Sequence, residues 1–207
     1  MTTTDTTAPT SDPRFAGRFL FLDLETTALN PETGGILQAA VAVTDWKFDV
    51  IHREEWWVLN DPNSITFDNG ALALHNRTGF LEQYLAAIGR GEGKDVRAMA
   101  HELAAVVRYH SAGVEAARGR GLVLAGANVE SFDRKWLAKH APGVVPMLHY
   151  RTLNTSSLRL VRASALACEV SDLTQTQSGQ HFAPRDVELA IEEAKACREI
   201  FAKAAGK

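Results

Sequence analysis

Residues 19–27 have the sequence FLFLDLETT. This nearly unbroken apolar run predicts a strand that is buried on both faces and ends in two acids. Because successive strand residues alternate between the two faces, Asp23 and Glu25 project on the same side. Two neighbouring carboxylates repel each other unless a cation lies between them, and hard divalent cations such as Mg²⁺ take oxygen ligands. The stretch therefore indicates either a metal site or a strand that ends in two solvent-exposed acids.

A second acid follows another predicted strand. Residues 121–128 (GLVLAGAN) are apolar and end in small residues, and residues 129–137 (VESFDRKWL) have helical spacing. Asp133 then lies in the first turns of a helix just after a strand end, where open sheets collect their ligands. Asn128, at the strand end, is a candidate cap for that helix. The simpler interpretation of Asp133 is a favourable charge near a helix N-terminus.

The third acid lies near the C-terminus. Residues 181–186 (HFAPRD) lead into a long amphipathic helix, and Pro184 suits its first position. Asp186 falls in the first turn of this helix and His181 in the loop before it. A loop histidine alone is typical of a surface residue, but beside the other acids it indicates a functional site.

Taken together, these motifs resemble the DEDDh branch of the DnaQ-like 3′–5′ exonuclease superfamily, and within it the oligoribonucleases. The matching positions are Asp23 and Glu25 in the first motif, Asn128 and Asp133 in the second, and His181 and Asp186 in the third. The branch that has tyrosine in the third motif would carry it where this chain has Phe182. Residues 149–151 (HYR) are similar to a His-Tyr-Arg segment of oligoribonucleases. The resemblance covers residues 18–201.

The resemblance implies the chemistry of the site. Two divalent ions, Mg²⁺ or Mn²⁺, would be held by Asp23, Glu25, Asp133 and Asp186 and would serve both ends of an in-line displacement at phosphorus. His181, which titrates near neutral pH, would take the proton from the attacking water. Leu29, Asn128 and Tyr150 would bind substrate, with Tyr150 acting across a homodimer interface. For Tyr150, amphipathic packing with a solvated hydroxyl is an equal alternative.

Two departures from the family keep other functions open. Oligoribonucleases usually carry a glutamate where this chain has Gln38, and a base-stacking tryptophan near residues 70–72, where this chain has Gly-Ala-Leu. The first hypothesis is a 3′–5′ exoribonuclease that hydrolyses short single-stranded RNA to 5′-mononucleotides. The alternatives are a DnaQ-like exonuclease on single-stranded DNA or longer RNA, and a non-catalytic module that binds nucleotide ends.

Length and composition fit one catalytic domain. The chain has 207 residues and a formal net charge of −3, so it has no broad basic surface of the kind that long duplexes favour. We expect an unstructured tail over residues 1–17 and a single exonuclease domain over residues 18–207. Two cysteines without metal or redox spacing favour a reduced, cytoplasmic location. No signal peptide or membrane span is predicted.

The expected fold class is α/β, a ribonuclease H-like mixed five-stranded sheet flanked by helices, and this expectation comes largely from the resemblance. Further strands are expected over residues 36–46 and 48–59, joined by a turn at residues 45–47. Helices are expected over residues 79–88, 96–110 and 156–167, and a mobile polar loop over residues 171–180. The Trp56-Trp57 pair favours strand packing over a base-stacking platform. The basic clusters at residues 118–121 and 159–162 are explained by a turn and a solvated helix face.

Overall fold

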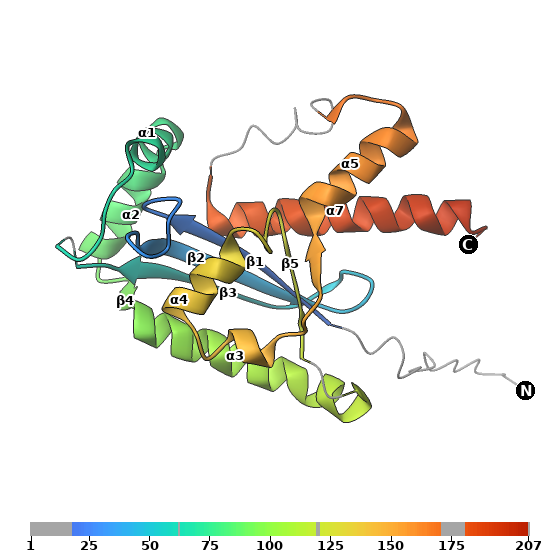
Figure 1. Ribbon diagram of the computed structural model, residues 1–207, viewed down its shortest axis with the longest axis horizontal. Coiled ribbons are helices and arrows are strands. Elements are labelled where there is room, and N and C mark those ends of the chain that lie inside the picture. The colour runs from blue at the N-terminus through green and yellow to red at the C-terminus, as the bar shows by residue number, and fades with distance from the viewer. Residues whose placement is uncertain (1–17, 62, 119–120, 171–180, 207) are drawn as a thin grey trace, which may run out of the picture.

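The computed structural model describes residues 18–61, 63–118, 121–170 and 181–206 (Figure 1). The predicted tail at residues 1–17 and the predicted mobile loop at residues 171–180 lie outside the described residues. The elements in chain order are β1 (Phe19–Thr26), β2 (Ile36–Thr44), β3 (Val50–Leu59), α1 (Asn69–Thr78), α2 (Phe80–Gly89), β4 (Gly93–Asp95), α3 (Val96–Arg118), β5 (Val123–Gly126), α4 (Asp133–His140), η2 (Val145–Met147), β6 (Thr152–Asn154), α5 (Thr155–Leu166) and α7 (Ala183–Ala204).

One mixed sheet runs through the described part of the chain, with the strand order β4-β3-β2-β1-β5-β6. β2 pairs with β1 and β3 in antiparallel register, whereas β5 is parallel to β1 and β6 is parallel to β5. The predicted fold class is confirmed, but the sheet has six strands rather than five. Two short strands were not predicted at their positions: β4, whose residues Gly93–Asp95 pair with the end of β3 at Trp57–Leu59, and β6 at Thr152–Asn154. Three residues of sequence GKD carry no alternation from which a strand could be predicted.

The two faces of β1 belong to two different core layers. Leu20, Leu22 and Leu24 pack with buried side chains of α3 and α4, among them Leu103 and Trp136. On the opposite face, Phe21 packs in a separate cluster built largely from α7 residues and the small side chains of β2. In Figure 1, α3 and α4 accordingly lie on one side of the sheet and α5 and α7 on the other. Asp23 and Glu25 follow Phe21 at spacing two and therefore face the α7 side.

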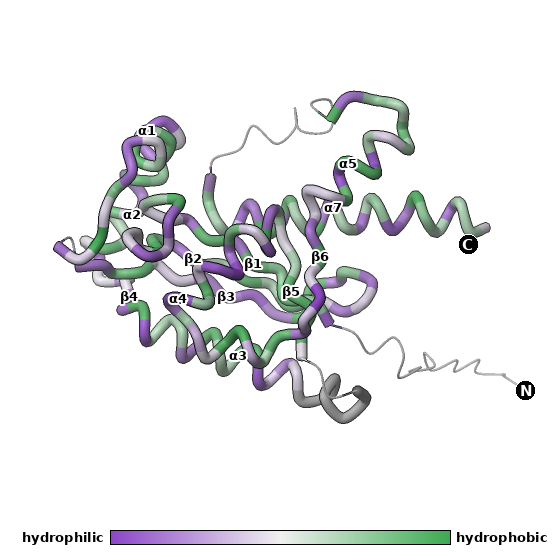
Figure 2. Tube along the Cα trace, viewed as in Figure 1, coloured by the Kyte–Doolittle hydropathy of each residue, from purple (hydrophilic) through white to green (hydrophobic). Residues whose placement is uncertain are grey.

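The helices that cover the sheet are amphipathic, as their sequences predict. Figure 2 shows hydrophilic and hydrophobic residues alternating along α3 and α7 at helical spacing. α7 begins earlier in the sequence than its apolar periodicity alone indicates. Ala183 and Pro184 already belong to its first turn. Among the described residues, no helix combines the length and the apolar character needed to cross a membrane.

Two local predictions are wrong. α1 was not expected. In the structure this helix, of sequence NGALALHNRT, buries only His75 and so has no buried apolar face. Asn128 does not cap α4: it has a left-handed backbone with φ of 54°, and its carbonyl accepts hydrogen bonds from the amides of Ser131 and Phe132 in a turn. α4 consequently begins only at Asp133, with Phe132 as its N-cap residue.

The remaining local predictions agree better. The turn between β2 and β3 is confirmed, with the Asp45 carboxylate accepting hydrogen bonds from the amides of Lys47 and Asp49. Trp56 is buried and Trp57 packs against Phe80, as expected for strand packing.

The start of β5 generates a stability prediction. A side chain at Gly121 would overlap the backbone carbonyl of Met147, whereas a Cβ at Gly143 would meet no atom within 4 Å. We expect Gly121→Ala to destabilise the protein by about 1–3 kcal/mol, because one of two backbone segments must move. Gly143→Ala should leave stability nearly unchanged. Chemical denaturation of both variants measures the difference, and equal midpoints would contradict the prediction.

Candidate active site

All five residues predicted to carry the chemistry line one cavity of about 660 Å³. They are Asp23, Glu25, Asp133, His181 and Asp186. They come from β1, the start of α4, and the loop and first turn at the start of α7. The structure thus brings together residues that are up to 163 positions apart in the sequence, since 186 − 23 = 163.

The position of the first two acids follows from the end of β1. In the antiparallel pair of β1 and β2, Asp23 lies opposite Ala40 and Glu25 lies opposite Gln38. The register then shifts by a bulge directly after Glu25. Ala40 is small, so the sheet face in front of Asp23 is not filled by its neighbour. The bulge ends the regular ladder at the mouth of the cavity, a place where bulges commonly redirect a chain next to a functional site.

Asp133 is the most deeply buried of these acids, with 2% of its surface exposed. It is the first residue of α4, where the free backbone amides of a helix favour a negative charge. One carboxylate oxygen, Oδ1, is buried without a hydrogen-bond partner among the described residues. A buried, unsatisfied carboxylate oxygen is costly, and it is the group that a cation would satisfy.

The start of α7 is fixed by Gln38. The side-chain oxygen of this buried residue accepts a hydrogen bond of 3.1 Å from the backbone amide of Ala183. One turn later, the Asp186 amide donates a hydrogen bond to the carbonyl of Phe182. This bond belongs to the first turn of α7, which carries Asp186. The residue that departs from the oligoribonuclease pattern thus holds the helix that carries the last acid.

The electrostatics of the site are dominated by burial. Burial, together with the nearby charges of Asp186 and Asp133, raises the pKa of Glu25 to about 8. Burial also raises the pKa of Asp133 to about 8, although hydrogen bonds from backbone amides oppose the shift. The pKa of Asp186 is raised by burial to about 6, against the lowering effect of the positive charges of His181 and Arg185. The pKa of Asp23 is raised well above its ordinary value by desolvation and by the other three acids.

This donor set fits a hard divalent cation. Glu25, His181 and Asp186 each offer a ligand atom, and these atoms lie within 4.8 Å of one another. Asp133, with its unsatisfied Oδ1, lines the same cavity, and carboxylate oxygens are ligands that Mg²⁺ or Mn²⁺ prefers. A cation would also keep all four carboxylates ionised at neutral pH, because its charge offsets their mutual repulsion.

His75 is a site residue that the sequence reasoning did not single out. It is buried, and its Nε2 lies 2.9 Å from the carbonyl oxygen of Thr26, so Nε2 carries the proton and donates. Nδ1 lies 3.8 Å from Glu25 Oε2 and has no hydrogen-bond partner among the described residues. Burial lowers the pKa of His75, which keeps the ring neutral. Its burial depends on the packing of α1 and could not be predicted from the local sequence.

The three predicted substrate contacts are placed differently. Leu29 and Asn128 line the cavity, and the Leu29 side chain is 78% exposed at its edge. Tyr150 is not among the described residues that line the cavity; it is 58% exposed, and the guanidinium of Arg151 lies 5.2 Å from its ring centre. The role of Tyr150 across a dimer interface stays a prediction, as do the catalytic, metal-binding and substrate-binding roles of the other residues.

In sequence and in structure, the chain is similar to known nucleases. No protein-family model matches the chain. In sequence, the chain is 27% identical to an oligoribonuclease of Coxiella burnetii over 176 residues, covering 84% of this chain and 88% of that protein. It is 29% identical to an oligoribonuclease of Bordetella pertussis over 190 residues, covering 90% and 96% of the two chains.

The solved structures agree on the fold. Exonuclease I of E. coli, in complex with a dT13 oligonucleotide, superposes with a TM-score of 0.66 at 19% identity over 92% of this chain. A second exonuclease I complex gives a TM-score of 0.62 at 21% identity. The chain spans only about 40% of the length of exonuclease I. Over most of its length the chain is therefore similar in sequence to proteins named oligoribonuclease, and its fold is that of exonuclease I.

Proposed function

We propose that this protein is a metal-dependent 3′–5′ exoribonuclease that hydrolyses short single-stranded RNA to 5′-mononucleotides. The observation that carries the proposal is the convergence of four carboxylates and one histidine in a single cavity. A protein that only bound nucleotide ends would gain nothing from clustering four acids whose ionisation burial opposes. The similarity to oligoribonucleases favours short RNA as the substrate.

In this mechanism each side chain has a defined task. Asp23, Glu25, Asp133 and Asp186 would hold two Mg²⁺ or Mn²⁺ ions, which when bound supply charge stabilisation and an activated water. His181 is exposed at the mouth of the cavity, and one of its ring nitrogens lies within 4.8 Å of the ligand atoms of Glu25 and Asp186. It would accept the proton of the attacking water and later release it to solvent.

The remaining groups would position the substrate. His75 would donate from Nε2 to the carbonyl of Thr26, directly after Glu25, and its neutral ring adds no positive charge to compete for the acids. The exposed Leu29 would insert between the last two bases, where an apolar side chain gains contact area and fixes the register of the strand. Tyr150 would contact a base bound to a second copy of the chain, which requires a homodimer.

A DNA exonuclease is the second candidate, because the superposed exonuclease I structures contain DNA oligonucleotides. The 2′-hydroxyl decides between the two sugars, so matched RNA and DNA substrates separate the candidates.

The proposed function predicts metal-dependent cleavage that Asp186 controls. With Mg²⁺, the wild type should hydrolyse an end-labelled RNA dinucleotide faster than a longer single-stranded RNA or the matching DNA. Asp186→Ala and chelation should abolish cleavage, and His181→Ala should slow it by roughly 10²–10⁴-fold. Asp49→Ala, which removes only a surface ion pair with Lys195, is the matched control and should not change the rate.

Three outcomes of this assay are informative. Preference for DNA or for longer RNA would keep the catalytic residues but reject the short-RNA substrate. Cleavage that survives Asp186→Ala would reject the metal-ligand assignment. Absence of hydrolysis on all substrates would leave the end-binding module.

The raised pKa values predict that the metal-free protein loses stability as the pH rises. Glu25 and Asp133 have pKa values of about 8 when folded, against ordinary values of 4.5 and 3.8. At pH values between the ordinary pKa values and about 8, the folded state holds protons that the unfolded chain has released. The free energy of unfolding therefore falls as the pH rises. Below the ordinary values this contribution is fully present, and above about pH 8 it is lost.

Thermal unfolding in a chelator at about pH 5.5 and about pH 8.5 tests this expectation. The unfolding temperature should be lower at the higher pH, and Asp133→Asn should reduce the difference because it removes one titrating group. Added Mg²⁺ should raise the unfolding temperature most at the higher pH, since metal binding displaces protons. A wild-type protein that gains stability over this interval would contradict the prediction.

A further inference from the structure

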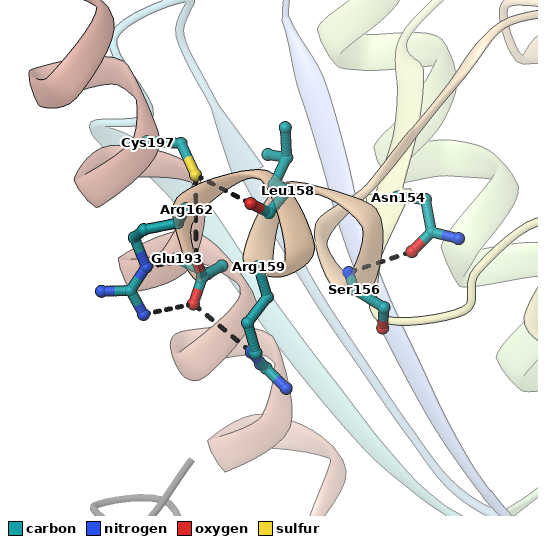
Figure 3. Close-up of polar contacts among 7 residues, drawn as sticks. All are labelled: Asn154, Ser156, Leu158, Arg159, Arg162, Glu193 and Cys197. Carbon is teal, nitrogen blue, oxygen red and sulfur yellow. Dashed lines mark hydrogen bonds and ion pairs between the residues drawn. The ribbon is translucent and has the colours of Figure 1, made fainter. Parts of the chain in front are cut away.

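Two arginines of α5 enclose a buried glutamate of α7 (Figure 3). Arg162 forms two hydrogen bonds with Glu193: Nε to Oε1 at 2.6 Å and Nη2 to Oε2 at 2.7 Å. Arg159 forms one longer bond, from Nε to Oε2 at 3.4 Å. The Glu193 side chain is fully buried, and each arginine side chain is only 18% exposed. The expected solvated helix face at residues 159–162 is therefore wrong at these two positions.

The ionic contacts of this cluster are unequal. Arg162 satisfies both carboxylate oxygens in a fork-to-fork arrangement, which is the strong form of this interaction. One bidentate arginine is enough to compensate a buried carboxylate, and losing it would leave an uncompensated charge. Arg162 alone compensates the negative charge of Glu193, so the positive charge of Arg159 is additional. The net charge of the three side chains is +1.

The surplus charge faces the catalytic cavity. Arg159 lines the same cavity as Asp23 and Asp186, and it is the only lysine or arginine among the described residues that do so. Its Nη groups make no hydrogen bond to the described residues, and in Figure 3 the guanidinium end that is clearly visible points away from Glu193. A guanidinium with free Nη groups in a partly desolvated cavity is suited to one anion class above all, a phosphate.

The position of α5 is itself fixed. The Asn154 side chain caps the helix by accepting a hydrogen bond of 3.0 Å from the amide of Ser156 (Figure 3). The same oxygen lies 3.3 Å from the amide of Asn128, at the edge of the cavity. Along the helix, Cys197 of α7 donates to the carbonyl of Leu158. Arg159 is thus held from a docked helix rather than from a free loop.

We propose that Arg159 binds a phosphate of the substrate, and that Glu193 is the positioning residue that directs its guanidinium into the cavity. This inference rests on the proposed nuclease function. The phosphate is either the one being cleaved or a terminal 5′-phosphate on the neighbouring nucleotide. Both present anionic oxygens to a planar fork of N–H donors, and the substrates of the test distinguish them.

The experiment compares Arg159→Gln, Arg159→Lys and the matched control Arg162→Gln on two RNA dinucleotides with Mg²⁺, pApA and ApA. Arg159→Gln should raise KM by about 10- to 100-fold with a smaller change in kcat, as expected for a lost charged hydrogen bond. Arg159→Lys should give an intermediate KM, because it keeps the charge and loses the fork. Arg162→Gln, whose side chain does not line the cavity, should lower the unfolding temperature more and KM less.

The pattern across substrates assigns the phosphate. An increase in KM for pApA alone identifies the terminal 5′-phosphate, and an equal increase for both dinucleotides identifies the phosphate that is cleaved. Unchanged KM in Arg159→Gln on both substrates would overturn the inference. An equal rise in KM for Arg162→Gln would also overturn it, since the effect would then come from the packing of α5.

A binding measurement separates this inference from the proposed function. Calorimetry of pApA with the Asp186→Asn protein, with and without Arg159→Gln, requires no hydrolysis. If the wild type cleaves nothing but Arg159→Gln weakens pApA binding, the nuclease function fails and the phosphate contact stands. If the wild type cleaves and the two binding constants are equal, the function stands and the contact fails. If the wild type cleaves nothing and pApA does not bind, both are rejected.

Discussion

Desolvation of four carboxylates in one cavity is the constraint on which the rest of the structure depends. The acids come from β1, α4 and α7, and their mutual repulsion opposes the packing of these elements. Two separate core layers, one on each face of β1, hold them in place against that repulsion. The buried apolar run at residues 19–24 therefore has a functional reason as well as a structural one, because a strand fixed on both faces cannot move its acids apart.

The groups that support the acids are neutral. Gln38 holds the first turn of α7 with an amide oxygen, and His75 contacts Glu25 and Thr26 with an uncharged ring. A carboxylate at position 38, as oligoribonucleases usually have, would add a fifth acid next to Glu25 on the neighbouring strand. The amide makes the same hydrogen bond to Ala183 without that charge. Among the described residues that line the cavity, Arg159 is the only lysine or arginine.

Local sequence was enough to predict those parts of the site that depend on local geometry. The alternation of a strand placed Asp23 and Glu25 on one face, and motif spacing placed Asp186 in the first turn of a helix. The contacts of His75 and Arg159 could not be predicted, because each depends on elements far apart in the sequence. Asn128 shows a different limit: its type suits a helix cap, but a left-handed backbone places it in a turn that comes before the helix. β4 was missed because pairing alone, without any pattern of its own, makes it a strand.

The position of the last acid couples the cavity to the packing of the C-terminal helix. Asp186 lies on α7, the same helix that supplies half of the buried residues of one core cluster and the buried Glu193. A partly folded molecule in which α7 has not docked lacks the fourth acid, the anchor of Arg159 and the cover over that face of the sheet. The acid cluster is therefore complete only in molecules in which α7 is packed on the sheet.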